Sequence, residues 1–237
     1  MNKQIINSIQ EYFEFIEDFQ QMDFKITLFR GQSTNQPLLP SIARKNPSFD
    51  STDIEIEMLD NIKRRSALLI KQPMRNDWEW LVMAQHYGLK TRLLDWTSNP
   101  LVALWFACSN EYKMDQKSYV YVLFAHNNAL VDLLSDESPF TSTTTRVYRP
   151  LLNNERIIAQ SGWFTSHIYS KLVDFNKFVD LQTNSNTNNK LIEIEVPANL
   201  KKEILKKLSL FGINNRTLYP DIAGLCNHIN WKYERHV

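Results

Sequence analysis

Hydrophobic side chains recur every three or four residues in several stretches of the chain. This spacing places them on one face of a helix, so each stretch is expected to pack that face against a core. Near the N-terminus Ile9, Phe13 and Ile16 follow the pattern and predict a helix within residues 1–22. The expected helices are residues 4–21, 52–70, 76–87, 100–108, 129–134 and a segment after Asn199 that ends before Gly212, with a last helix at the C-terminal end.

Shorter apolar or alternating stretches predict strands. Ser118–Ala125 is rich in β-branched and aromatic residues, which is typical of a buried strand. Leu191–Val196 alternates isoleucine and valine with glutamate and predicts a half-exposed strand, and Lys25–Arg30 predicts a short one. The pattern indicates an α+β fold in which helices cover a modest mixed or antiparallel sheet. We expect a single domain over residues 1–237 with a core at 25–232.

Residues that favour helix ends agree with these boundaries. Thr52-Asp53-Ile54-Glu55 has the spacing of a capping box. Gly88 suits the left-handed position just after a helix, because it has no Cβ. Ser98 or Asn99 can cap the next helix, and Pro100 fits its first position.

Composition excludes several classes of protein. The net charge of +1 argues against a protein that coats nucleic acid. Cys108 and Cys226 lie in apolar helical patterns, so both are expected to be reduced core residues, and no CxxC pair suggests zinc. The first twenty residues carry four acidic side chains, and the longest apolar run, Pro100–Cys108, is too short to span a bilayer. We therefore expect a cytoplasmic protein without a metal or a membrane partner.

Glycine is scarce, with only five in the chain, whereas an average protein has about 7%. Such a chain is expected to keep glycine where the backbone needs a positive φ or where another group approaches closely. The five are Gly31, Gly88, Gly162, Gly212 and Gly224.

A polar hinge interrupts the segment Ala84–Ala107, which we call the central segment. Packing alone needs few polar side chains, so those in the hinge indicate a site. His86 suits either acid–base chemistry or a hydrogen-bonding anchor, and Asp95 suits either a catalytic carboxylate or a cap of the following turn. The polar and aromatic residues of the hinge are His86, Tyr87, Lys90, Thr91, Arg92, Asp95, Trp96 and Thr97.

Arginine, glutamine and glycine occur together twice outside the central segment. Arg30 and Gln32 flank Gly31 at the end of a predicted strand, and Arg156 precedes Gln160 and a glycine. The planar guanidinium of Arg30 suits a phosphate or a carboxylate, and the alternative is a buried structural ion pair.

These motifs, taken in order, resemble the FRG domain family, whose name stands for Phe-Arg-Gly. Each motif alone is short, but together they extend from about residue 29 to 228. The matching residues are Phe29–Gln32, Leu39–Ser41, Arg44, Ala84–Gly88, Thr91–Thr97, Asn99–Ala107, Arg156, Gln160, Gly162, Phe164, Leu218–Asp221 and Gly224–Leu225.

The resemblance implies a bacterial or phage-linked protein that acts as a toxin or defence effector. A strand-end Arg-Gly followed by a Ser/Thr turn and an aromatic helix is also similar, more remotely, to ADP-ribosyltransferases. That similarity implies an ADP-ribosyltransferase-like arrangement that consumes NAD as substrate, with a protein or nucleic acid acceptor and an antitoxin or immunity protein as partners.

The same similarity implies roles for individual residues. Arg30 would hold the NAD phosphates, and Thr97 with Ser98 would order the nicotinamide side. The carboxylate that stabilises the ribosyl cation is left open among Asp95, Asp221 and the Glu193-Ile194-Glu195 motif, which suits an alternating strand equally well. Gln160 stands where active relatives would carry a glutamate. The expected catalytic residues are Arg30, Asp95, Gln160 and Asp221, and the expected NAD-binding residues are Arg30, Gln32, His86, Arg92, Trp96, Thr97 and Ser98.

Two other interpretations remain open. The polar cluster can belong to a non-catalytic module that binds a nucleotide, sugar or RNA end by stacking on Trp96 or Tyr87. Alternatively, Arg30, Asp95 and Arg92 form a buried ion network that only stabilises the domain.

Overall fold

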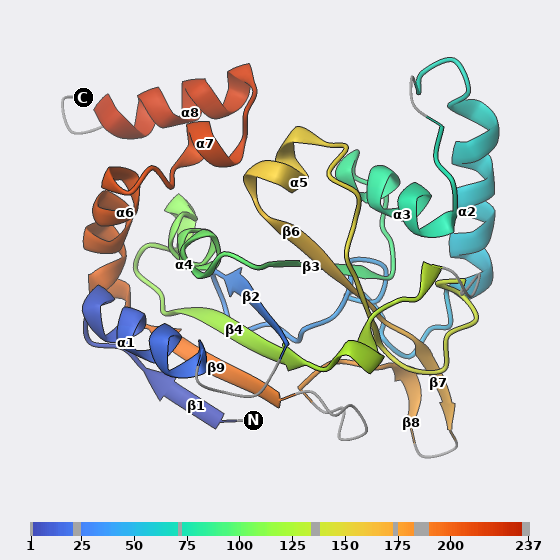
Figure 1. The fold of residues 1–237 in the computed structure, drawn as a ribbon, viewed down its shortest axis with the longest axis horizontal. Coiled ribbons are helices and arrows are strands. Elements are labelled where there is room, and N and C mark those ends of the chain that lie inside the picture. The colour runs from blue at the N-terminus through green and yellow to red at the C-terminus, as the bar shows by residue number, and fades with distance from the viewer. Residues whose placement is uncertain are drawn as a thin grey trace.

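A mixed sheet of seven strands underlies the fold, in the order β1-β9-β4-β2-β3-β6-β5, and β7 and β8 form a separate hairpin (Figure 1). The structure, a computed structural model, describes residues 2–20, 25–70, 73–133, 138–172, 175–182 and 190–233. All neighbours in the large sheet are antiparallel except β1 and β9. The strands are β1 (Asn2–Ile5), β2 (Ile26–Gln32), β3 (Leu93–Thr97), β4 (Ser118–Ala125), β5 (Arg146–Tyr148), β6 (Gly162–Ser166), β7 (Tyr169–Leu172), β8 (Phe175–Phe178) and β9 (Lys190–Val196).

Helices cover one face of this sheet in two groups, as the buried clusters show. Helices α1, α4 and α6 pack over β9, β4 and β2, whereas α2, α3 and α5 pack over β3, β5 and β6. The α-helices are α1 (Ile9–Gln20), α2 (Thr52–Arg65), α3 (Asp77–His86), α4 (Pro100–Cys108), α5 (Glu155–Ala159), α6 (Lys201–Leu210), α7 (Asn215–Leu218) and α8 (Ile222–Tyr233), and the 3-10 helices are η1 (Glu111–Lys113), η2 (Asn127–Ala129) and η4 (Ala198–Leu200). The predicted single α+β domain with a mixed, helix-covered sheet is confirmed.

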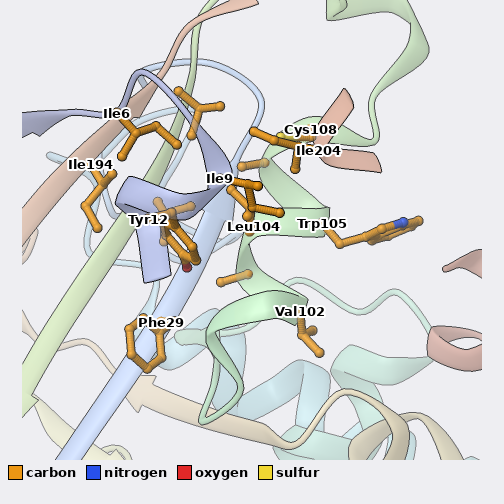
Figure 2. Close-up of a cluster of buried hydrophobic side chains, with 14 of the residues drawn as sticks. Ile6, Ile9, Tyr12, Phe29, Val102, Leu104, Trp105, Cys108, Ile194 and Ile204 are labelled. Carbon is orange, nitrogen blue, oxygen red and sulfur yellow. The ribbon is translucent and has the colours of Figure 1, made fainter. Parts of the chain in front are cut away.

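Helix α4 lies at the centre of the larger cluster (Figure 2). Its residues are apolar on every side, as expected for a helix buried all round. Leu104 packs in one cluster with Ile194 of the sheet and Ile204 of α6. The Tyr12 hydroxyl of α1 donates to the Pro100 carbonyl at 2.8 Å, which ties the N-terminal helix to the first residue of α4.

The other face of the sheet is covered by irregular segments. Leu28, Trp96 and Tyr121 lie on this face and pack against Leu38 from the segment after β2 and Leu181 from the segment after β8. The two faces of β2 and β3 therefore meet different environments, with helices on one side and loops on the other.

Several predicted elements need correction because tertiary pairing overrides local pattern. Residues 2–5 form strand β1, which pairs in parallel with β9, so the N-terminal helix begins only at Ile9. The hinge of the central segment contains strand β3, which pairs with β6 along its whole length. Strand β9 lies between β1 and β4 and is not half-exposed: Glu193 is buried and pairs with Lys3 at 3.1 Å.

The predicted capping box of α2 is wrong. Ser51 is the N-cap residue without a side-chain hydrogen bond, and Glu55 is fully buried. The Glu55 carboxylate accepts from Arg92 Nε at 2.7 Å and from the Arg92 backbone at 2.6 Å. Thr52 also faces this arginine and accepts from Nη2 at 3.1 Å. Glu55 therefore serves a buried ion pair and does not cap the helix.

Other local predictions are also wrong. Helix α2 ends at Arg65, before the predicted Ile70, and only a 3-10 turn forms near 129–134, of which residue 134 lies outside the described residues. Cys226 is exposed, although Cys108 is buried as expected. Lys201, expected in solvent with its neighbouring lysines, is buried and donates to the Lys113 carbonyl at 2.8 Å, because its long stem crosses apolar surface to reach a polar partner.

Gly31 shows why a glycine is needed in strand β2. A Cβ at this position would lie 1.9 Å from the Ala103 carbonyl oxygen and 2.5 Å from the Ala107 backbone nitrogen. Both atoms belong to helix α4, so the helix and the strand touch backbone to backbone. A methyl group would force them apart, because neither backbone atom can swing aside.

We predict that Gly31→Ala destabilises the protein by about 1–3 kcal/mol or more, as expected for overpacking against backbone. Equilibrium denaturation measures the free energy of unfolding. Gly162→Ala is the matched control, since its Cβ would meet the nearest atoms at 3.6 Å, an ordinary contact. Equal stability of the two variants would contradict the close approach of α4 to β2.

The buried pair Arg92–Glu55 yields a second stability prediction. Arg92→Ala leaves the Glu55 carboxylate buried without its cation, and we expect the free energy of unfolding to fall by about 3–5 kcal/mol. Lys207→Ala breaks an exposed pair with Glu203 and should leave the denaturation midpoint nearly unchanged. An Arg92→Ala variant as stable as the wild type would show that the pair does not hold α2 to β3.

Candidate functional site

Most of the residues proposed from the motifs meet in one pocket of about 370 Å³. Its walls come from β2, α3, β3, α4, α5, β6 and the residue that follows α7. Pockets of this size accommodate small-molecule ligands. The lining residues on which the argument depends are Arg30, His86, Asp95, Gln160, Trp163 and Tyr219.

The pocket opens where β2 and β3 separate. Strand β2 pairs with β4 over seven positions, but in the described chain it pairs with β3 only at Phe29 and Thr97. Beyond that position the Arg30 side chain reaches across and donates from Nη1 to the Asp95 carbonyl at 2.7 Å. A side-chain hydrogen bond thus replaces the missing strand ladder and places the guanidinium at the pocket wall.

Arg30 is the dominant positive group of the pocket. Its side chain is 15% exposed, and its Nε has no hydrogen-bond partner among the described residues. Burial lowers the pKa of Arg30 to about 10, and the nearby Asp95 opposes this shift. The guanidinium is still protonated at neutral pH, so it presents a fixed charge that water screens weakly.

Asp95 provides a carboxylate beside Arg30, from strand β3. Its side chain is 61% exposed, and Oδ2 lies 3.9 Å from Arg30 Nη1. Gln85 donates from Nε2 to Asp95 Oδ1 at 2.7 Å, and Gln85 Oε1 accepts from the Thr91 hydroxyl. This chain of hydrogen bonds fixes the amide of Gln85 in one orientation, so the carboxylate is held in place while remaining accessible.

Thr97 and Gln160 connect the pocket to its surroundings. The Thr97 hydroxyl donates to the Gln160 carbonyl at 2.6 Å and accepts from the Asn99 backbone at 3.0 Å. The Gln160 side chain donates to the Leu218 carbonyl at 3.0 Å. Both residues lie at the pocket, but these hydrogen bonds hold β3, α5 and α7 together.

Asp221 lies at the rim and is tied to Arg156. Arg156 Nη2 is 2.7 Å from Asp221 Oδ2, and its guanidinium lies over the Tyr219 ring at 5.2 Å from the centroid. The Asp221 carboxylate also accepts from the Gly224 backbone at 2.8 Å. Arg156 holds the pKa of Asp221 below its ordinary value.

His86 is half-buried at the edge of the pocket. Burial lowers its pKa from the ordinary 6.5, and the nearby positive charge of Arg156 lowers it further. The imidazole is therefore uncharged at neutral pH and able to accept a proton.

The Trp96 indole belongs to the floor beneath the pocket. It is 3% exposed and donates from Nε1 to the Thr165 hydroxyl at 3.0 Å. Thr165 lies 3.1 Å from His167 Nε2, and His167 Nδ1 lies 2.7 Å from the Val179 carbonyl. Because a carbonyl only accepts, His167 carries its proton on Nδ1 and accepts from Thr165 at Nε2. Burial on this scale leaves no face of Trp96 for a stacked base.

Three of the residues proposed for NAD binding lie outside the pocket. Gln32 donates to the Gln36 carbonyl at 3.2 Å, and Ser98 is exposed in the turn before α4. Arg92 is 2% exposed and paired with Glu55. Its position is that of a structural ion pair, separate from Arg30 and Asp95.

No site role was predicted from the sequence for four other residues of the pocket. Gln85 orients Asp95, Arg156 holds the rim, and the rings of Trp163 and Tyr219 form walls. Arg156 lies in the second Arg/Gln/Gly motif, and Gln85 lies beside His86. Those positions were the available signals. Trp163 gave no signal distinguishable from a core aromatic residue.

A larger hollow of about 960 Å³ adjoins the pocket. It lies between α2, α3 and the segment before α5, and apolar residues such as Met58, Ile62 and Met83 line most of it. Val82, His86 and Ile157 line both cavities. The smaller pocket is the better candidate site, because charged and hydrogen-bonding groups converge there.

The fold and the pocket define a class of protein: an α+β domain with a ligand-sized site at a split in its sheet. Comparison with protein families assigns residues 25–116 to the FRG domain, so the resemblance read from the motifs is confirmed over this segment. Arg30, Gln85, His86 and Asp95 all lie within it. No curated protein and no solved structure matches the chain, and the similarity to ADP-ribosyltransferases stays a prediction.

Two further properties concern cofactors and membranes. In the described ranges, no three His, Cys, Asp or Glu side chains gather as metal ligands. The helices that can be described are all too short or too polar to cross a bilayer.

The His167 network predicts how stability depends on pH. Burial lowers the pKa of His167 from 6.5 to about 4, against the opposing effect of its hydrogen bond to Val179. Between pH 6.5 and 4 the unfolded chain binds a proton that the folded protein does not, so stability falls as the pH is lowered through this range. The loss amounts to about 3 kcal/mol at pH 4.

Urea denaturation at several pH values measures this effect. His167→Gln removes the titrating group, and its free energy of unfolding should change less between pH 7 and 4 than that of the wild type, by about the same 3 kcal/mol. Parallel curves for the two proteins would show that His167 titrates normally.

Proposed function

We propose that the pocket binds NAD and that the protein breaks its nicotinamide–ribose bond, passing ADP-ribose to a macromolecule or to water. The observation that carries the proposal is the juxtaposition of buried, cationic Arg30 with accessible Asp95, held by Gln85, in one pocket. One group suits the pyrophosphate of the substrate, and the other suits the positive charge that develops on the ribose.

Arg30 is proposed to bind the phosphates. Its planar guanidinium suits a contact with phosphate oxygens through the Nη atoms, since Nε is buried. The hydrogen bond to the Asp95 carbonyl fixes the group before substrate arrives, so little side-chain entropy is lost on binding.

Asp95 is proposed to stabilise the ribosyl cation. When the C–N bond breaks, its electron pair leaves with nicotinamide, and positive charge develops on the sugar ring. A carboxylate already oriented by Gln85 stabilises that charge without reorganising. Among the carboxylates considered, Asp221 is neutralised by Arg156 at the rim and Glu193 is paired with Lys3, so Asp95 is the one we assign.

The remaining groups supply positioning and the acceptor side. Flat rings of Trp163 and Tyr219 suit the nicotinamide or adenine ring. An uncharged His86 at the junction of the two cavities suits a general base that takes the proton of an incoming hydroxyl as the new C–O bond forms. Gln160 and Thr97 position the surrounding elements.

Nicotinamide release from NAD by the purified protein tests the proposal. We expect release by the wild type, and at least about a 100-fold lower rate in Arg30→Ala and in Asp95→Asn, the size expected when a preorganised charge is removed. Arg64→Ala and Asp53→Asn are the matched controls, because both residues lie exposed on α2 outside the pocket. Their rates should equal that of the wild type.

Two results would contradict the enzyme. The first is no release by the wild type, with or without cell lysate as a source of acceptor. The second is unchanged release in both pocket variants, with their folding verified by circular dichroism. Calorimetric binding of NAD or ADP-ribose without release would favour the non-catalytic binding module, which the same pocket supports through Arg30 and its aromatic walls.

A further inference from the structure

Helix α8 carries an apolar surface that faces away from the rest of the molecule. It lies at the periphery, beside α7 (Figure 1). Its inner side, with Gly224, His228 and Trp231, packs toward α4, α6 and α7. The outer side is exposed: Ile222 by 75%, Ile229 by 44%, and Cys226 is also exposed.

The exposed apolar residues form one continuous stripe. At 3.6 residues per turn they fall within about 100° of arc, opposite the buried side. Their spacing, with steps of three and four residues, is that of a helix that packs along another helix. The stripe consists of Ile222, Leu225, Cys226, Ile229 and Tyr233.

The spacing of four apolar positions in the stripe is the same whether it is followed from the N-terminal or the C-terminal end of α8. From Ile222 the next positions are Cys226, Ile229 and Tyr233, and the steps read four, three, four from either end. Two antiparallel copies of α8 therefore set Ile222 against Tyr233 of the second copy and Cys226 against its Ile229. Any helix can pair antiparallel with its own copy about a two-fold axis, and the symmetric spacing of this stripe then sets its apolar residues directly opposite one another.

The charges beside the stripe favour the same arrangement. Asp221 and Lys232 lie on the same flank of the stripe, at opposite ends of the helix. In an antiparallel pair, the same flank of both helices lies on the same side of the interface, and the N-terminal end of one helix lies beside the C-terminal end of the other. Asp221 of each copy therefore lies near Lys232 of the other. In a parallel pair, this flank would meet the side that carries Ala223, Asn227 and Asn230, which offers no opposite charge.

We propose that two copies of this chain associate through antiparallel packing of their α8 helices. The proposal is independent of the NAD reaction, although Asp221 connects the two regions through its bond to Arg156 at the pocket rim. One pair of helices about 18 Å long forms a small interface, so the dimer is expected to dissociate on dilution.

Sedimentation velocity on the full chain tests the association. The wild type should shift from 27.9 kDa toward twice that mass as its concentration rises through about 1–100 µM, the range of weak interfaces. Ile229→Glu places a charge at the centre of the stripe and should remain monomeric throughout. Leu172→Glu is the matched control: this leucine is 66% exposed on β7, far from the stripe in sequence, and its variant should dimerise like the wild type.

Disulfide trapping tests the direction of the helices. Ile229→Cys, with natural Cys226, should form a covalent dimer under mild oxidation, because each Cys226 faces position 229 of the other copy. The double variant Cys226→Ser/Ile229→Cys should not, since position 229 then faces serine. Cys108 is buried and does not compete.

The outcomes decide the proposal whether or not NAD is cleaved. A wild type that stays monomeric over the whole range overturns it, as does an Ile229→Glu variant that dimerises normally. Efficient trapping of the double variant would overturn the antiparallel arrangement, because it requires like positions to meet. Loss of dimerisation in Leu172→Glu as well would place the interface elsewhere.

Discussion

The backbone contact between α4 and β2 constrains much of the molecule. At Gly31 the helix approaches closely enough that a single methyl group would collide with its carbonyl oxygen. This contact positions α4 at Ala103 and Ala107, and Asn99 caps the first turn of the helix by accepting from the Leu101 and Val102 backbone. Strand β3 ends just before that cap, so the position of α4 also determines where β3 runs. Gly31 itself lines the pocket at the gap between β2 and β3.

Hydrogen bonds from side chains hold this gap open. In a continuous sheet the backbone groups of neighbouring strands satisfy each other, whereas here Arg30 satisfies the Asp95 carbonyl. Gln85 from α3 holds the Asp95 side chain, and the carbonyl of Gln160, just after α5, accepts from the Thr97 hydroxyl. Each wall of the pocket is thus tied to another element. A site built in this way is organised before any ligand binds.

Charge is distributed unequally between the interior of the pocket and its rim. Arg30 is largely buried beside an accessible carboxylate, whereas Arg156 is half-exposed and already paired with Asp221. The inner cation is therefore the one less screened by water, and it is the better candidate for binding an anion. The rim pair connects α5 to the start of α8. This ion pair therefore links the N-terminal end of α8 to the rim of the pocket.

The sequence alone determined the elements whose signals are local: helices α3 and α4, a cap of α4 at Ser98 or Asn99, the buried strand β4, the left-handed Gly88, and the α+β class. It also identified Arg30 from the Arg-Gly at a strand end, and His86 and Asp95 from the polar residues concentrated in a hinge. All three meet in one pocket. Only the tertiary structure decided that the hinge contains β3, that Glu55 pairs with Arg92 and that Lys201 is buried. These features depend on partners 37 to 88 residues away in the chain. A local pattern cannot reveal them, because the same Thr-X-X-Glu or lysine-rich helix is equally stable in solvent when no such partner is present.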